Sequence, residues 1–298
     1  MRTTTMRTTT MRSTKILGLL VILLSLVATV WPVLITNPQA QRETVIAVTG
    51  QEVELLGYGP YRHMPKDMAV QGFAQDWITL GLGIPVLFFA LFVPNIQKLR
   101  NRIFAIGISG YFLVQYTMYL TMAAYNELFL VWTGLVGFSF HLLLGLILPL
   151  INGSISVQYP SKRQFLGWFL VGNGLLMALL WFSIILGPLF DGTFYPQELE
   201  HLTTLIVQGL DLAIFLPPSI LGGIWYLRGK SAGWWLAPAY GVFLVMQMIA
   251  LGAKILGMSL QGVSAGPALV IIPLLGLGAV VGTAFGLRGL GQKESGAV

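Results

Sequence analysis

Three ionisable side chains fall within or beside strongly apolar stretches, and they are the first candidates for chemistry. Asp76 opens one stretch, Asp211 lies well inside a second, and Lys254 lies near the end of a third. An ionisable group in hydrocarbon costs about 2.5 to 3.5 kcal/mol at mid-helix, so such a residue is by default a candidate functional residue. We expect Asp211 and Lys254 to face each other, as a structural ion pair or as part of a ligand site.

Neutral polar residues accompany these charges at helical spacing. Gln115 and Tyr119 are four residues apart, and Gln208 precedes Asp211 by three, so each pair lies on one side of its helix. A polar cavity is the simplest common explanation, although the tyrosines also fit an interfacial aromatic belt and Lys254 could extend to the headgroups. The predicted ligand-binding set is Arg62, Asp76, Tyr116, Tyr119, Tyr125, Asn126, Gln208, Asp211 and Lys254.

The residue inventory excludes several kinds of chemistry. The chain has no cysteine, which excludes thiolate nucleophiles, zinc-thiolate sites and iron–sulfur clusters. Only His141 of the three histidines falls in a predicted span, so a haem held by two intramembrane histidines is excluded. The carboxylates are isolated and not paired beside a nucleophile. We therefore expect no cofactor and no metal.

The elements that position these residues are predicted from composition and length. The 298-residue chain is 55% hydrophobic and only 9% charged, with a mean hydropathy of +0.78, whereas soluble domains have roughly a quarter of their residues charged. A helix that crosses a bilayer needs about 20 apolar residues. The sequence predicts an all-α transmembrane bundle of about eight helices, at 16–35, 77–94, 103–124, 128–151, 165–187, 203–227, 233–256 and 266–287.

The orientation of the bundle follows from its lysines and arginines, which are retained in short cytoplasmic loops. With both termini in the cytoplasm of a cell-membrane protein, 13 of the 17 basic residues lie on the inner side. The net charge of +6 is a by-product of this rule, so no nucleic-acid partner is expected. Residues 1–15 form a low-complexity tract that we expect to be disordered, and residues 16–298 form one domain. The alternative reading of 16–35 is a cleaved signal peptide.

The only long segment between the predicted spans is 36–76, on the outer side. Strand-like runs at Thr44–Thr49 and Glu52–Leu56, with Gly50 between them, predict a small β-hairpin cap. Lys66–Asp76 is expected to lie along the membrane surface before the second span. This segment is either a solvated cap or a lid or recognition element, which Tyr58, Tyr61 and Arg62 would serve.

A weak internal repeat links the third and seventh spans. Gly110–Gln115 matches Gly241–Met246 at four of six positions, with an offset of 131 residues. A proline-bearing helix and a short basic loop precede each copy. The repeat predicts two parallel four-helix halves, an arrangement found in transporters.

One further resemblance concerns the outer polar positions. Residues 50–255 resemble a loose group of prokaryotic multi-pass membrane proteins to which no activity is attached. The motifs that carry the resemblance are Gly57–Arg62, Gln71, Gln75 and Asp76, Pro85, Tyr125–Phe129 and Gln208–Pro217. The resemblance implies a shared outer polar cluster and no particular reaction.

Three classes of function remain open. The first is a transporter or small-ligand-binding protein with an outward-facing polar cavity, whose partners are the lipid bilayer and a small molecule. The second is an enzyme acting on a lipid-linked substrate at the outer leaflet, with Asp76, Glu127 or Asp211 as acid or base and Arg62 with Lys66 binding a headgroup. The third is a sensor or accessory subunit. The oligomeric state is open in all three.

Overall fold

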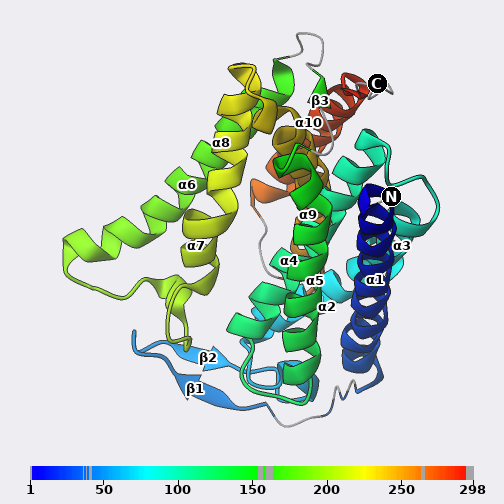
Figure 1. Ribbon diagram of the computed structural model, residues 1–298. Helices are drawn as coiled ribbons and strands as arrows, with labels where there is room; N and C mark the ends of the chain where they lie inside the picture. Colours follow the sequence, from blue (N-terminus) through cyan, green and yellow to red (C-terminus); the bar gives the residue numbers. More distant parts are fainter. Residues whose placement is uncertain are drawn as a thin grey trace.

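The protein is a bundle of long helices, with only short strands (Figure 1). The computed structural model describes residues 2–35, 37, 39, 42–153, 157–158, 164–262 and 266–292. Within this part of the chain, eight helical segments are long and apolar enough to cross a membrane, which confirms the predicted number. They are α1 (Arg2–Leu34), α2–α3 (Lys66–Ile78 and Ile84–Phe92), α4 (Leu99–Met122), α5 (Phe129–Ile151), α6 (Phe165–Asp191), α7–α8 (Ile206–Leu210 and Leu216–Leu227), α9 (Ser231–Leu260) and α10 (Ala268–Arg288).

Two segments differ from the sequence expectation at their N-terminal ends. The first helix begins at Arg2, so it extends through the low-complexity tract that we expected to be disordered. The second begins at Lys66 and continues without a break to Phe92. Lys66–Asp76 is therefore the first part of the second apolar helix and not a separate surface helix.

The second and sixth apolar helices each contain a wider, π-helical turn. These turns are η2 (Thr79–Gly83) and η4 (Asp211–Phe215). Each is followed, after one intervening residue, by proline, Pro85 in one helix and Pro217 with Pro218 in the other. A proline ring clashes with the carbonyl four residues earlier, and a widened turn at that point relieves the clash. Asp211 is the first residue of its widened turn, and Asp76 comes shortly before the other.

The two halves of the chain share one pattern of neighbours. In the first half, α1 packs against α3 and α5, and α4 packs against α3 and α5. In the second half, α6 packs against α8 and α10, and α9 packs against α8 and α10. The halves meet along α9, which packs against both α2 and α4, with Gly107 on α4 pressed against the backbone of Ala239. This arrangement is the one that the predicted parallel repeat requires.

Short strands lie outside the helices. The pair β1 (Thr44–Ile46) and β2 (Glu52–Glu54) is antiparallel, and Gly50 in the turn has φ +80°, so the predicted hairpin forms with shorter strands. The 3₁₀ turn η1 (Gly59–Tyr61) follows it, and η3 (Gln197–Leu199) lies between α6 and α7. At the opposite end of the bundle, β3 (Val157–Gln158) pairs with β4 (Gly291–Gln292).

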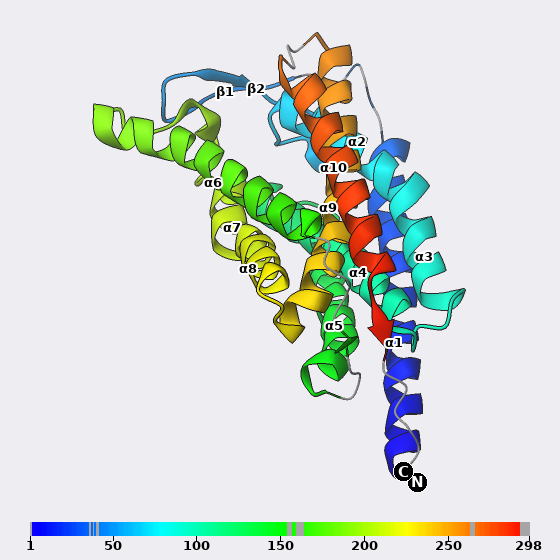
Figure 2. The same ribbon diagram turned by 90° about the horizontal axis from the view of Figure 1, so that it is seen from above.

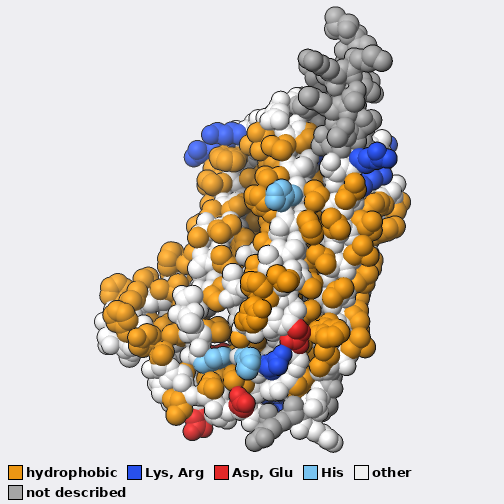
Figure 3. Space-filling model, turned by 60° about the horizontal axis from the view of Figure 1, so that its bottom comes forward, with side chains coloured by type: hydrophobic (Ala, Val, Ile, Leu, Met, Phe, Trp, Pro, Cys, Tyr) orange, Lys and Arg blue, Asp and Glu red, His pale blue; other side chains and the backbone are white. Residues whose placement is uncertain are grey.

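Charge separates along the bundle. Most lysine and arginine side chains in view lie at the end opposite the hairpin, whereas aspartate and glutamate lie near the hairpin end (Figure 3). The start of α4 and the end of α10 lie at the same end, since Arg100 Nη2 donates a hydrogen bond of 2.9 Å to the carbonyl of Arg288. Lys162, Arg163 and Lys293, which belong to the predicted inner segments, lie outside the described residues.

The periphery of the bundle is apolar. Helix α6 reaches away from the other helices (Figure 2), and its side chains are largely exposed, as at Leu179 and Phe190. Exposed apolar area of this extent is unusual for a monomeric soluble protein. The interior is concentrated on α4, where Tyr111, Phe112 and Tyr116 are fully buried.

Candidate functional site

Asp76 is the most deeply buried of the three candidate charges, with 2% of its surface exposed. Both of its carboxylate oxygens accept hydrogen bonds from tyrosines. Tyr61 Oη donates to Oδ2 at 2.6 Å, and Tyr119 Oη lies 3.0 Å from Oδ1 and 2.9 Å from the carbonyl of Gly72. A buried carboxylate requires such partners, because an unpaired one is strongly destabilising.

Tyr61 brings the outer segment into this site. It ends the η1 turn, and its ring is fully buried, stacked on Tyr119 with ring centroids 5.9 Å apart. At Gly72 an added Cβ would lie 3.3 Å from the Tyr61 ring, so the glycine provides room for the ring on α2. Burial, together with the neighbouring Asp76, raises the pKa of Tyr61 well above its ordinary value. Tyr61 therefore remains a hydrogen-bond donor at any physiological pH.

A second polar layer lies next to Asp76, on the side away from the β1–β2 hairpin. Gln75 Nε2 donates to Tyr111 Oη, and Tyr111 Oη lies 3.0 Å from Thr79 Oγ1. Thr79 is the first residue of the π-helical turn η2, so the layer attaches that turn to α4. The helix that carries Asp76 is therefore held at two successive levels along its axis, first by the tyrosines that contact Asp76 and then by Tyr111.

Asp211 is half-buried, and its partner is an indole. Trp181 Nε1 on α6 donates to Asp211 Oδ2 at 2.9 Å. Trp181 was not among the predicted site residues, because a tryptophan in an apolar helix carries no signal that distinguishes it from a lipid-facing one. Its contact fixes the start of η4 against α6.

Lys254 on α9 is half-buried and comes from a third element of the fold. In the part of the chain that the structure describes, it makes no hydrogen bond and no ion pair within 4.0 Å. Its charge nevertheless interacts with both Asp76 and Asp211 over longer range. The expected direct pair of Asp211 with Lys254 is therefore replaced by one ammonium group shared between two carboxylates.

The outer rim holds the remaining predicted residues, with different roles. Arg62 Nη2 pairs with Glu127 Oε2 at 2.7 Å, which joins the outer segment to the loop between α4 and α5. Burial opposes ionisation of Glu127, but hydrogen bonding to its own backbone and to Arg62 outweighs it and lowers the pKa. Asn126 shapes the same loop, since its Oδ1 accepts a hydrogen bond of 2.8 Å from the Leu128 amide. Tyr125 is 83% exposed and lies outside the cluster.

The predicted amides and the second tyrosine of α4 lie in the interior. Tyr116 is 1% exposed, Gln115 4% and Gln208 9%. Gln247 Oε1, on the same helix as Lys254, is buried with no hydrogen-bond partner among the described residues. An acceptor of this kind is destabilising unless a donor reaches it.

Chemically, this arrangement is better suited to binding than to acid–base catalysis. Asp76 could reach a substrate only by displacing Tyr61 or Tyr119, and Glu127 is already paired with Arg62. No group of three metal-ligating side chains is found among the described residues. Compared with known proteins, the chain matches no protein-family model, no curated protein and no solved structure.

Proposed function

We propose that the chain is a multi-pass membrane protein with both termini in the cytoplasm, and that it binds a small positively charged ligand, as a transporter or ligand-binding protein. The site is the cluster of Asp76, Asp211 and Lys254. The bilayer placement is supported by the eight apolar helices and the apolar periphery. The orientation is supported by the 13 of 17 basic residues on the proposed inner side.

The observation that carries the ligand proposal is the charge balance of the cluster. Two carboxylates and one ammonium group, from α2, η4 and α9, interact without a direct ion pair. When all three are ionised, they leave one negative charge in a largely apolar surrounding. An uncompensated charge there is costly, so a ligand with a single positive charge stabilises the site. A small primary ammonium ion carries such a charge.

Access is proposed from the outer side, where the hairpin segment lies. That segment contacts the cluster through Tyr61 and is tied to a neighbouring loop by Arg62. It therefore acts as a lid, held by the buried Tyr61 ring and its hydrogen bond, by the exposed Arg62 ion pair and by a hydrogen bond of 2.9 Å between the His63 carbonyl and His201. The exposed pair is worth about 0 to 1 kcal/mol, so it is easily broken when the ligand enters.

The test uses the purified protein in detergent with ethylammonium chloride as the probe and sodium chloride at equal ionic strength as the reference. Ligand binding to the folded state raises the unfolding temperature with concentration. We expect ethylammonium to stabilise the wild type more than sodium does, and Asp211→Asn to remove the difference. Asp191→Asn is the matched control, because Asp191 contacts only Thr193 near the end of α6. Equal effects of the two salts on the wild type, or loss of the effect in the control, would contradict the proposal.

A further inference from the structure

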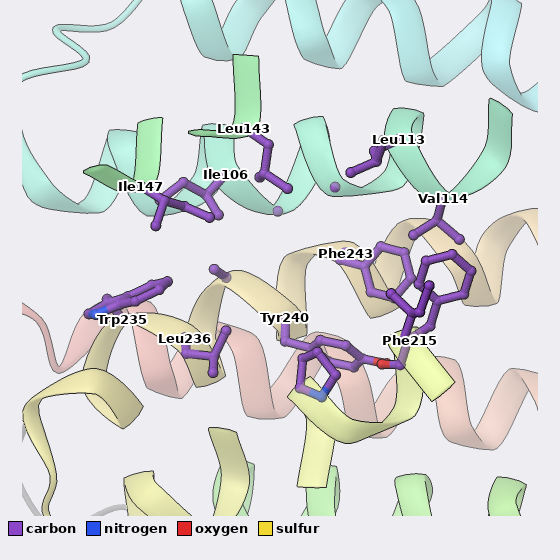
Figure 4. Close-up of a pocket in the computed structure, with 15 residues that line it drawn as sticks. Ile106, Leu113, Val114, Leu143, Ile147, Phe215, Trp235, Leu236, Tyr240 and Phe243 are labelled. Atoms are coloured by element: carbon purple, nitrogen blue, oxygen red, sulfur yellow. The ribbon is translucent and has the colours of Figure 1, made fainter. Parts of the chain in front are cut away.

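An apolar groove of about 250 Å³ lies between α4, α5, α8 and α9, away from the charged cluster (Figure 4). Its floor includes Gly110 on α4, and its walls include Leu143 on α5, Phe215 of η4 and Phe243 on α9. No charged side chain lines it. The hydroxyl of Tyr240 is already used, since it donates to the carbonyl of Phe215 at 3.0 Å.

The groove is open to the side of the bundle. The main packing partners of α5 are α1 and α4, whereas those of α8 are α6 and α9. The side chains of α4 and α5 therefore line one side of the space and those of α8, η4 and α9 the other, with Ile147 opposite Trp235 and with Phe215 beside Val114 and Phe243 (Figure 4). Apolar side chains are exposed beside the opening on both walls, as at Leu144 and Ile214.

Two glycines on α4 show that the space is real. An added Cβ at Gly107 would lie 2.4 Å from the Ala239 carbonyl oxygen, so α4 and α9 are in contact there. One turn further on, a Cβ at Gly110 would have no atom within 4 Å. At Gly110 the surface of α4 therefore lies apart from the neighbouring helices, and no described side chain fills the space between them.

We propose that this groove binds one hydrocarbon chain of a membrane lipid, which enters sideways between α5 and α8. The inference rests on the proposed placement of the chain in a bilayer. The floor residues 106–114 lie in the middle of α4, at the depth where lipid tails are the surrounding medium. Apolar cavities of roughly 150 Å³ stay dry and bind benzene, so this larger groove suits a segment of an alkyl chain better than water.

The test reconstitutes the full chain in nanodiscs of phosphatidylcholine in which one acyl chain carries a diazirine at its middle. After illumination, mass spectrometry locates the labelled peptides. We expect labelling at Leu143–Ile147 and at Ile214–Pro218. Gly110→Leu places a side chain in the groove without a backbone clash and should reduce this labelling several-fold. Gly172→Leu is the matched control, because its Cβ also meets no atom but lies on α6, outside the groove.

Labelling of the exposed face of α6 separates the two proposals. If that face is labelled and the groove peptides are labelled equally in the wild type and Gly110→Leu, the groove proposal is overturned and the bilayer placement stands. If no helix is labelled, both are overturned. Should Gly110→Leu fail to fold, Gly110→Ala adds a single methyl group in the same open space, and a partial loss of groove labelling is expected.

Discussion

Tyr61 donates a hydrogen bond of 2.6 Å to Asp76, 15 residues further along the chain, from the segment after the β-hairpin into the buried face of α2. The contact joins the segment after the hairpin to Asp76, which is buried in the bundle. Because Tyr119 supplies the second donor from α4, the position of α2 depends on two hydroxyl groups from two different elements.

Removing the first hydroxyl should destabilise the protein measurably. A hydrogen bond to a charged group contributes about 1.5 to 3 kcal/mol, so we expect Tyr61→Phe to lower the free energy of unfolding by about that amount. Tyr119→Phe should cost less, because its contact with Asp76 is longer, at 3.0 Å. Tyr125→Phe, at an exposed ring, should change nothing. Denaturant unfolding of the purified variants measures the order of their stabilities. A Tyr61→Phe variant as stable as Tyr125→Phe would show that the hydrogen bond between Tyr61 and Asp76 does not stabilise the fold.

The two glycines of α4 should respond oppositely to the same change. Gly107→Ala brings its methyl group against the backbone of Ala239 and should separate α4 from α9, costing about 1 to 3 kcal/mol. Gly110→Ala meets nothing and removes a glycine from a helix, which favours folding by about 0.5 to 1 kcal/mol. Thermal unfolding of both variants checks this. Equal destabilisation would mean that the groove at Gly110 is closed.

The shared ammonium group predicts a particular order among charge variants. Lys254→Met leaves two carboxylates in an apolar surrounding without a cation and should be the least stable variant. Asp211→Asn keeps an oxygen for Trp181 and should be milder. The double variant Asp211→Asn with Lys254→Met should be more stable than Lys254→Met alone. A double-mutant cycle should give a coupling energy of about 0.5 to 3 kcal/mol between the two residues. Strictly additive effects would show that the two residues do not interact.

Glu200 provides a pH-dependent test outside the helices. Burial and, secondarily, the charge of Asp67 raise its pKa, and its Oε2 has no hydrogen-bond partner among the described residues. A carboxyl group whose pKa is raised on folding destabilises the folded state as the pH rises from the unfolded value of 4.5 through the folded value. Glu200→Gln should therefore be more stable than the wild type at pH 7, and the gain should vanish toward pH 4. Unfolding curves of both proteins between pH 4 and pH 7 measure this difference in stability. A difference that is the same at pH 4 and at pH 7 would exclude ionisation of Glu200 as the cause.

The sequence was sufficient to predict the eight helices and the hairpin, because both depend on local pattern. Long apolar runs can be satisfied in a bilayer only as helices, and Gly50 between two β-prone runs favours a turn. The predicted start of the second span at residue 77 was wrong, because Lys66–Asp76 contains enough polar residues to resemble a surface helix whereas the helix begins at Lys66. The last two polar side chains of this segment are instead buried and hydrogen-bonded inside the protein, Gln75 to Tyr111 and Asp76 to Tyr61.

The site was only partly predictable. The position of a residue along its helix can be counted from the sequence, but the rotation of the helix about its axis and its tilt cannot. Depth placed Asp76, Asp211 and Lys254 in the outer half of the bilayer or at its outer rim, and the structure brings both acids within electrostatic range of Lys254. The pairing of Asp211 with Trp181 depends on how α6 leans on η4, which no spacing in the sequence encodes. The same applies to Tyr61, whose position depends on the path of the loop after the hairpin.

We propose that the cluster of Asp76, Asp211 and Lys254 is reached from the outer side and attracts cations. The chain has no cysteine, so Lys254→Cys can be labelled alone in intact cells, with Gln51→Cys in the exposed hairpin turn as the reference. The probes are membrane-impermeant methanethiosulfonates, one carrying a trimethylammonium group and one a sulfonate. Because two carboxylates lie nearby, we expect Lys254→Cys to react faster with the cationic reagent than with the anionic one, relative to Gln51→Cys. We expect the added substitution Asp211→Asn to reduce this preference for the cationic reagent. No reaction from outside while Gln51→Cys is labelled, or a preference for the sulfonate, would contradict the proposal.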